Sequence, residues 1–532
     1  MARLTQSLVI IALLAGAPAC AQDRAQETVV RRVGISAPLS SFAPGDLPAS
    51  PEPMASPMRS VTGPLKGTPL KLAPGVEPRH PHPILSGTPA LPPVRTGGTQ
   101  VNTDGIASGL PGVTGAVGEQ QYVQLAAGRM AVFRKQDGAM LTGPAATHAL
   151  FAGAARGARD CATPHATTGS VEYDRHAKRW VVAHLATFSG QATYCIAVST
   201  TSDATGPYHL YAMKIQGAGG AALDVQDARM ALWSGAWYAS FSVFDDAHGA
   251  WRGARVCAVD RAALLRGRDT VARCVNPGSA FGPVVVAGLE GDAQPAHGTP
   301  AMLIALDFDG DGNGARLLLW RFHFSLAAAG IGEPVAIPVA PFRIACAGGA
   351  ACIGQPHPGV NLFAQGDRLL PRAAYRHDAG RETLVLAHAV QMDDGRSALR
   401  WYELRAPLQA IQVYQQGTHT PDHDHRTMGS IGADKAGNIA LGFSVAGSDT
   451  PPGMRYTGRH RSDPPGRMQA EEFIVNGAGV QLAAAHRMPA SGALSLDPTD
   501  GCTFWYTQHY LPLTGHNTWR TRIASFKFGN CT

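Results

Sequence analysis

The chain has few charged and few aromatic residues for its length. Of its 532 residues, 16% are charged and 7% are aromatic. No block of Lys and Arg alternates with aromatic residues, and a net charge of +6 is weak for a chain this long. We therefore expect no nucleic-acid partner. Amphipathic helices are also scarce after residue 110, and the 61 glycines suit short strands joined by turns.

Several catalytic motifs are absent from the sequence. It contains no G-x-S-x-G nucleophile elbow, no Walker loop, no dinucleotide fingerprint and no C-x-x-C pair. Serine-hydrolase, nucleotide-binding and cysteine-based metal chemistry therefore have no support from sequence motifs.

One apolar run, at the N-terminus, has the features of a secretory signal. In MARLTQSLVIIALLAGAPACAQ, Arg3 precedes a short apolar core, Leu8–Ala15, and two A-x-A cleavage patterns follow. This predicts a signal peptide over residues 1–21 and a secreted or periplasmic protein. Lipid anchoring through Cys20 is the alternative, although Ala17 and Pro18 make a poor lipobox. No other run reaches transmembrane length, so we expect no membrane span after cleavage.

Eight cysteines follow the signal region, and an even number in an exported protein predicts disulfides. Many pairings are open, and the simplest joins neighbours along the chain. In that order the eight are Cys161, Cys195, Cys257, Cys274, Cys346, Cys352, Cys502 and Cys531.

Proline is concentrated before the main domain. Residues 31–100 hold 15 of the 39 prolines and few aromatics. Since proline lacks a backbone N–H donor, long strands or helices are disfavoured there. We read residues 22–105 as a flexible linker or pro-segment, with an arm wrapped around the domain as the alternative.

From residue 106 to 532 a strand–turn–strand pattern repeats. Examples are VEYDRHAKRWVVAHLATF, ARMALWSGAWYASFSVF, RAAYRHDAGRETLVLAHAV and SIGADKAGNIALGFSV. Repeats of about 60 residues built from hairpins are typical of the blades of a β-propeller. We predict an all-β fold with seven blades; six or eight blades and a pair of stacked sandwiches are the alternatives.

The last repeat contains SLDPTDGCTFWYTQHY, which is close to the Asp-box of sialidases and related propellers. Asp174, Asp434 and Asp497 stand just before the turn in three different repeats. A residue type that recurs at turns is more typical of structure than of catalysis. We therefore expect the Asp to shape the turn and Trp505 to pack between sheets.

Several segments together resemble a widespread family of uncharacterised secreted bacterial proteins. They are YDRHAKRWVV, CIAVSTTSDATGPYHLYAMKI, LRWYELR, VYQQGTHTPD, SIGADKAGNIALGFS, RYTGRHRSDPPG and DGCTFWYTQHY. The resemblance covers residues 110–532 and implies an exported β-propeller without a settled activity. Where the family has an Arg-Trp-Gly-Asp-Tyr run, this chain has AAAHRMPASGALSLDP, so any site built on that run is altered here.

Two segments carry candidate metal ligands. HTPDHDHR (residues 419–426) alternates His and Asp, which could face a divalent cation or simply be solvated. DFDGDGNG places Asp307, Asp309 and Asp311 as in the start of a Ca²⁺ loop, but Leu318 replaces the twelfth-position acid. Ca²⁺ is the one cofactor considered, and an Asp/Gly hairpin turn is the alternative.

A set of arginines could bind a sugar carboxylate, because guanidinium groups bind carboxylates in a bidentate manner. The candidates are Arg426, Arg455, Arg459, Arg520 and Arg522. Glycoside hydrolysis also needs two acids, or a Tyr activated by an acid. The candidates for these roles are Tyr456, Glu403 and Asp422. Ion pairing between blades is the alternative.

Three functions stay open from the sequence. The first is an exported propeller, expected to be monomeric, that binds a glycan or protein outside the cytoplasm at one mouth. The second is a glycoside hydrolase with a sialidase-like arginine cluster. The third is a surface structural or adhesion protein. Propellers host many unrelated functions, so the fold alone cannot select among them.

Overall fold

The computed structural model describes residues 25–42, 59, 95–109, 112–154, 158–164, 169–188, 191–217, 220–245, 249–349, 351–378, 380–405, 407–408, 410–482 and 492–532. This part of the chain is all-β, with one short α-helix, α1 (Arg261–Leu265). Its 3₁₀ turns are η1 (Leu39–Ser41), η2 (Thr147–Phe151), η4 (Asp160–Ala162) and η6 (Ala347–Gly349). No helix in these ranges is long and apolar enough to cross a membrane. The predicted signal peptide, including Cys20, and the substituted AAAHRMPAS stretch lie outside the described residues.

The strands form antiparallel sheets that follow one another along the chain. One sheet has β3 (Val113–Val117), β4 (Gln121–Ala126), β5 (Arg129–Arg134) and β6 (Met140–Ala146). The next strands are β7 (Gly169–Asp174), β8 (Arg179–Phe188), β9 (Gln191–Ser199) and β10 (Tyr208–Ile215). After them come β11 (Leu223–Trp233), β12 (Ala236–Asp245), β13 (Trp251–Asp260) and β14 (Thr270–Gly278).

The second half of the chain continues the pattern. β15 (Val285–Leu289), β16 (Ala301–Phe308) and β17 (Asn313–Phe324) are completed by β18 (Ala329–Ile331) and β19 (Val335–Arg343), which both pair with β17. β20 (Ala373–Asp378), β21 (Arg381–Gln391), β22 (Ser397–Arg405) and β23 (Gln412–His419) follow. The next sheet has β24 (His425–Ala433), β25 (Ile439–Ala446), β26 (Gly453–Arg459) and β27 (Glu472–Val475).

Two ends of the chain complete the last sheet. It contains β28 (Ala493–Leu496), β29 (Thr503–Tyr510), β30 (Arg520–Lys527) and, from the N-terminal side, β2 (Thr99–Asp104). β2 pairs antiparallel with β30, so one sheet joins segments about 420 residues apart. Trp505 on β29 is 3% exposed and stacks on Tyr122 of β4 at 5.3 Å between ring centroids. The expectation that this Trp packs between sheets is confirmed.

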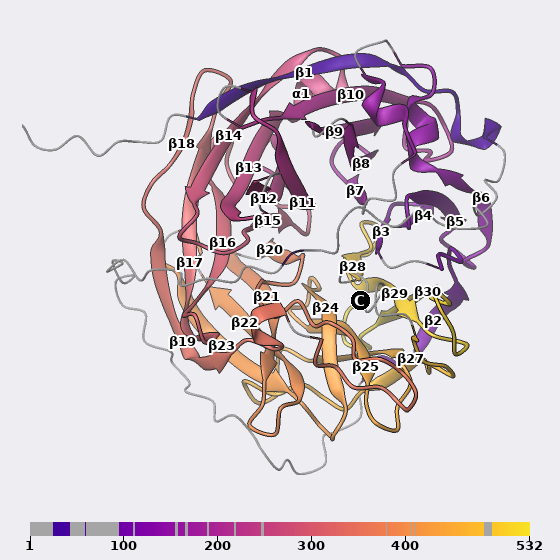
Figure 1. The fold of residues 1–532 in the computed structure, drawn as a ribbon, viewed down its shortest axis with the longest axis vertical. Coiled ribbons are helices and arrows are strands. Elements are labelled where there is room, and N and C mark those ends of the chain that lie inside the picture. The colour runs from indigo at the N-terminus through magenta and orange to yellow at the C-terminus, as the bar shows by residue number, and fades with distance from the viewer. Residues whose placement is uncertain are drawn as a thin grey trace, which may run out of the picture.

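The first strands of the successive sheets form a closed ring. β3 contacts β7, β7 contacts β11, β11 contacts β15, β15 pairs with β20, β20 contacts β24, β24 contacts β28, and β28 contacts β3. Figure 1 shows the sheets arranged radially around this ring. The fold is therefore a β-propeller, in which each sheet buries its faces against its neighbours and the first strands line a central channel.

β1 (Gln26–Ile35) lies within the range expected to be a flexible linker, and that expectation does not hold for these residues. β1 pairs with β10 on one side and with β14 on the other, and so joins the outer edges of two sheets (Figure 1). β2 likewise lies inside the 22–105 range. Both strands match the alternative of an arm wrapped around the domain. The sequence QETVVRRVGI explains β1, because its β-branched residues favour an extended strand.

The recurring turn aspartates are confirmed as structural. Asp174 Oδ1 accepts hydrogen bonds from the backbone N–H groups of His176 and Ala177 at 3.1 and 2.9 Å. Asp434 and Asp497 accept backbone N–H bonds in their own turns, both at 2.9 Å. All three are buried. Each carboxylate satisfies turn amides that would otherwise be unpaired.

The sequential disulfide pairing is confirmed. The bridges are Cys161–Cys195, Cys257–Cys274, Cys346–Cys352 and Cys502–Cys531. Cys257 and Cys274 face each other across β13 and β14. Cys502–Cys531 ties the turn before β29 to the chain end after β30. The bridges fit an oxidising compartment.

Candidate functional site

Arg426 and Arg455 meet, but they meet around a buried glutamate. Glu471 accepts hydrogen bonds from Arg426 Nε at 2.8 Å and from Arg455 Nη1 at 2.9 Å, and His419 Nε2 lies 2.7 Å from its Oε1. Asp422 binds Arg426 Nη2 at 2.7 Å. We call these five residues the Glu471 cluster.

The charges of the Glu471 cluster compensate one another. Burial alone would raise the pKa of Glu471, but His419 and Arg426 outweigh it and hold the pKa far below the usual range. The Arg426 side chain has no exposed surface, and that of Arg455 is 11% exposed. Both guanidinium groups are therefore occupied by protein carboxylates.

Two other predicted arginines, Arg459 and Arg522, have partners elsewhere. Arg459 donates to the backbone oxygens of Asp463 and Arg467 at 2.6 and 3.2 Å. Arg522 on β30 binds Asn102 and Asp104 of β2, at 2.6 and 2.9 Å. Of the candidate arginines, Arg426 and Arg455 share a carboxylate partner, Glu471.

The predicted acid and Tyr candidates also make structural contacts. Tyr456 is buried, stacks on Phe526 at 3.8 Å and bonds the Thr96 hydroxyl at 2.6 Å. Burial raises its pKa to about 12. Glu403 is buried and binds Gln415 at 2.5 Å and also Arg405.

The candidate Ca²⁺ loop is a hairpin turn between β16 and β17. Asp307 forms an ion pair with Arg316 at 2.6 Å, and Asp309 accepts the backbone N–H groups of Asp311 and Asn313 at 3.0 and 2.8 Å. Among the described residues, no group of three or more His, Cys, Asp or Glu is placed to hold a metal ion. In the His/Asp segment, His425 Nδ1 accepts the Ser397 backbone N–H at 3.1 Å.

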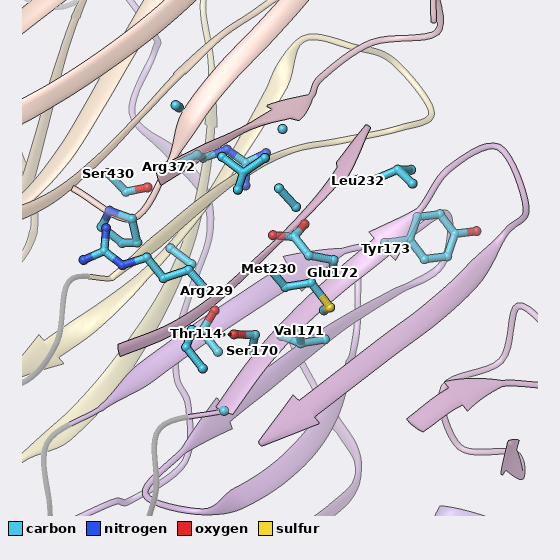
Figure 2. Close-up of a pocket in the computed structure, with 18 of the residues that line it drawn as sticks. Thr114, Ser170, Val171, Glu172, Tyr173, Arg229, Met230, Leu232, Arg372 and Ser430 are labelled. Atoms are coloured by element: carbon cyan, nitrogen blue, oxygen red, sulfur yellow. Dashed lines mark hydrogen bonds between the residues drawn. The ribbon is translucent and has the colours of Figure 1, made fainter. Parts of the chain in front are cut away.

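A cavity lies in the central channel, lined mainly by the first strands of the sheets. Its volume is about 130 Å³, and its walls come from β3, β7, β11, β15, β20, β24 and β28. Figure 2 shows the side chains that face it, among them Glu172, Arg229 and Arg372. None of these three was singled out from the sequence.

Glu172 is the exceptional residue of the cavity. It lies on β7, and no hydrogen bond or ion pair joins its carboxyl group to another described residue, although its oxygens point into the channel (Figure 2). Burial raises its pKa to about 7, against the opposing charge of Arg372 and with a further increase from Glu290. Near neutral pH this carboxyl group therefore exists in both the protonated and the ionised form.

Arg372 interacts electrostatically with Glu172 and is hydrogen-bonded to a second carboxylate, Glu290. Its Nε donates to Glu290 Oε1 at 2.8 Å, and the Glu290 side chain is 2% exposed. Burial opposes the charge on Arg372, but Glu290 and Glu172 outweigh it and raise its pKa. Glu290 stands at the end of β15 and Arg372 at the start of β20, and the parallel pairing of these strands brings them together.

Asp227 lines the same cavity from β11. It has a positive φ of 53° at a bulge in the strand. Its Oδ1 accepts from Arg229 Nε at 2.9 Å and its Oδ2 from Arg368 Nη1 at 3.0 Å. The cavity thus combines one unpaired carboxyl group with one carboxylate fixed by two guanidinium groups.

Two further basic residues face the cavity beside β7. Burial lowers the pKa of both Arg175 and His176, and Arg175 Nη1 lies 3.4 Å from Asp292. His176 Nε2 is buried and has no hydrogen-bond partner among the described residues. The imidazole is therefore neutral at neutral pH and adds no charge next to Glu172.

Comparison with known proteins yields only distant similarities. No family model and no curated protein matches the sequence. The Hadza microbial sialidase Hz136 is 10% identical, with a TM-score of 0.35 over 77% of this chain and 74% of that one. The α-L-arabinofuranosidase Arb93A from Fusarium graminearum is 6% identical, with a TM-score of 0.38 over 82% and 99%. Penicillium chrysogenum α-L-arabinanase is 9% identical, with a TM-score of 0.35 over 66% and 91%. Similarities this weak do not assign a catalytic residue or an activity of these proteins to this chain.

Proposed function

We propose that this chain is an exported glycoside hydrolase whose site is the central channel, with Glu172 as the general acid. The supporting observation is a carboxyl group inside the channel with a pKa of about 7 and no protein partner among the described residues. A general acid works best when its pKa is close to the working pH. Two carboxyl groups in unlike environments are the usual requirement for cleaving a glycosidic bond.

Asp227 is the second carboxylate of this proposal. Protonated Glu172 gives its proton to the glycosidic oxygen as the bond from that oxygen to the anomeric carbon breaks. Asp227, fixed by Arg229 and Arg368, then either removes a proton from the attacking water or bonds the anomeric carbon. In the second route, ionised Glu172 then removes a proton from a water molecule, which attacks the anomeric carbon and releases the Asp227 carboxylate. The first route inverts the configuration at that carbon and the second, with two displacements, retains it, so the anomer of the fresh product distinguishes them.

The test is release of sugar from a panel of glycans by the purified chain. We expect Glu172→Gln to lower kcat by about 10²–10⁴-fold, and activity of the natural chain to fall as the pH rises through about 7. The exposed Glu333→Gln is the matched control and should keep full activity. Equal activity of Glu172→Gln and the natural chain would remove Glu172 from the mechanism.

A non-catalytic glycan- or protein-binding propeller is the second candidate. It is favoured by the ion pairs that hold Arg229 and Arg372, because these make the channel wall rigid before any ligand enters. Retention of a glycan without release of sugar, in the same assay, would select this function. Absence of both signals would favour the structural or adhesion role.

Four further expectations accompany this function. We propose seven blades, supported by the ring of first strands, and cleavage of the signal peptide after residue 21, checked by the mass of the exported chain. Ca²⁺ binding by Asp307, Asp309 and Asp311 stays a prediction. Calorimetric titration of the chain with Ca²⁺ tests it, and the monomeric state is checked by light scattering.

A further inference from the structure

Arg59 is held against the propeller at four points, although it comes from the proline-rich range before the domain. Its backbone N–H donates to Gln226 Oε1 at 2.9 Å, and its backbone oxygen accepts from Arg368 Nη2 at 2.9 Å. Its Nε donates to Asp224 Oδ2 at 3.0 Å, and its Cζ lies 6.0 Å from the centre of the Phe244 ring.

These contacts lie next to the wall of the channel. Asp224 and Gln226 lie on β11, directly before Asp227, which lines the cavity. Arg368 is 2% exposed and bridges the Arg59 backbone oxygen to the Asp227 carboxylate. A ligand at this position therefore touches the same charged group that fixes Asp227.

The chemistry of the four contacts specifies the ligand. A ligand that offers both a backbone N–H and a backbone C=O is a peptide. Here Gln226 accepts from the N–H and Arg368 donates to the C=O of the same residue. A carboxylate beside an aromatic ring, as in Asp224 and Phe244, favours a cation. A planar guanidinium group can donate a hydrogen bond to the carboxylate while it lies over the ring.

We propose that Asp224, Gln226, Phe244 and Arg368 form a subsite for an arginine residue of a peptide, and that Arg59 occupies it in cis. The ion pair is partly exposed, since the Arg59 and Asp224 side chains are 39% and 23% accessible, so on its own it is weak. Covalent connection raises the effective concentration of Arg59 at the subsite, which explains occupancy by a weak contact. Another arginine-bearing peptide must displace Arg59 to bind at this edge of the channel.

The test is binding in trans. A fluorescein-labelled peptide with the sequence of residues 55–63, ASPMRSVTG, is titrated into the full chain and followed by anisotropy. We expect Arg59→Ala to bind it at least tenfold more tightly than the natural chain, because the variant keeps only the two backbone contacts and leaves the side-chain positions beside Asp224 and Phe244 unfilled. The double variant Arg59→Ala/Asp224→Asn should lose at least fivefold of that affinity, and Arg59→Ala/Glu333→Gln should lose none. A peptide with Ala in place of Arg should not bind to any variant.

Two outcomes would overturn the subsite. One is equal binding of the Arg and Ala peptides, and the other is failure of Arg59→Ala to bind either. Hydrogen exchange at the Arg59 amide of the intact chain is a second readout that needs no empty subsite. It should be slow in the natural chain and faster in Gln226→Ala, and equal exchange would contradict the proposal. No glycan is present in either assay, so the result is independent of the proposed hydrolysis.

Discussion

The Glu471 cluster and the channel around Glu172 use the same residue types with opposite results. In the cluster, two arginines and a histidine surround one glutamate, and His419 and Arg426 hold its pKa far below the usual range despite burial. In the channel, Arg372 is bound by Glu290, and Glu172 is left with a pKa of about 7. The difference lies in which carboxylate receives the hydrogen bonds.

Burial makes this difference large. Within a protein, an ion pair with good geometry offsets the cost of removing two charges from water, whereas an unpaired carboxyl group avoids that cost by binding a proton. Glu471 follows the first course and Glu172 the second. Carboxyl groups with raised pKa values are enriched at functional sites, so the contrast favours the channel over the cluster.

Substitution of the central acid of the cluster should have the largest effect. Glu471→Gln leaves Arg426 and Arg455 buried without their shared carboxylate, which costs about 3–5 kcal/mol in the free energy of unfolding. Urea unfolding at pH 7 measures this. The neighbouring Glu472→Gln, for which no ion pair is seen among the described residues, is the matched control, with an expected change within about 0.5 kcal/mol.

The pH dependence of that loss is a sharper test. A depressed folded-state pKa stabilises the fold above the unfolded-state pKa of about 4.3, and this contribution declines as the pH falls below it. The difference between the natural chain and Glu471→Gln should therefore be largest above pH 5 and shrink toward pH 2. A difference that is constant with pH would show that Glu471 is not held ionised.

Glu172→Gln should change the stability in the opposite direction. A raised folded-state pKa means that the natural chain loses stability as the pH rises from about 4.5 to about 7. Gln cannot ionise, so the variant should be more stable than the natural chain at pH 8, by about 3 kcal/mol, and nearly equal to it at pH 4.5. Thermal unfolding at the two pH values measures this, and Glu333→Gln should show neither change. Destabilisation at pH 8 would mean that the carboxylate is needed ionised.

The features that the sequence predicts correctly are local ones. The four disulfides close short loops, and Asp174, Asp434 and Asp497 bond amides within their own turns. The alternation of apolar residues in strands and the turn residues of hairpins are also patterns of neighbouring residues. The repeated hairpins, and with them the propeller, can therefore be predicted from the sequence. β1 was missed because the prolines that follow it dominated the composition, although VVRRV itself favours a strand.

The site could not be found in this way, because ring closure creates it. Glu172, Glu290 and Arg372 are up to 200 residues apart, and only the packing of β7, β15 and β20 brings them to one cavity. Of the arginines chosen for their charge, Arg426 and Arg455 are bound by Glu471, which lies in a loop with no motif. The available signal was an acid between Val171 and Tyr173 in the first strand of its sheet, β7.

The smallest effect is expected at the edge of the Glu471 cluster. Asp422 binds Arg426 as Glu471 does, but its side chain is 47% exposed, so water screens the pair. Asp422→Asn should cost about 0.5 kcal/mol at low salt and less in 1 M NaCl, where charges are screened within about 3 Å. The loss for Glu471→Gln should be nearly independent of salt because its pairs are buried. Denaturant unfolding of both variants at the two salt concentrations measures the two losses of stability. The comparison is direct because both carboxylates bind the guanidinium group of Arg426. Equal losses would show that burial does not set the strength of these pairs, and the contrast between cluster and channel would then need another cause.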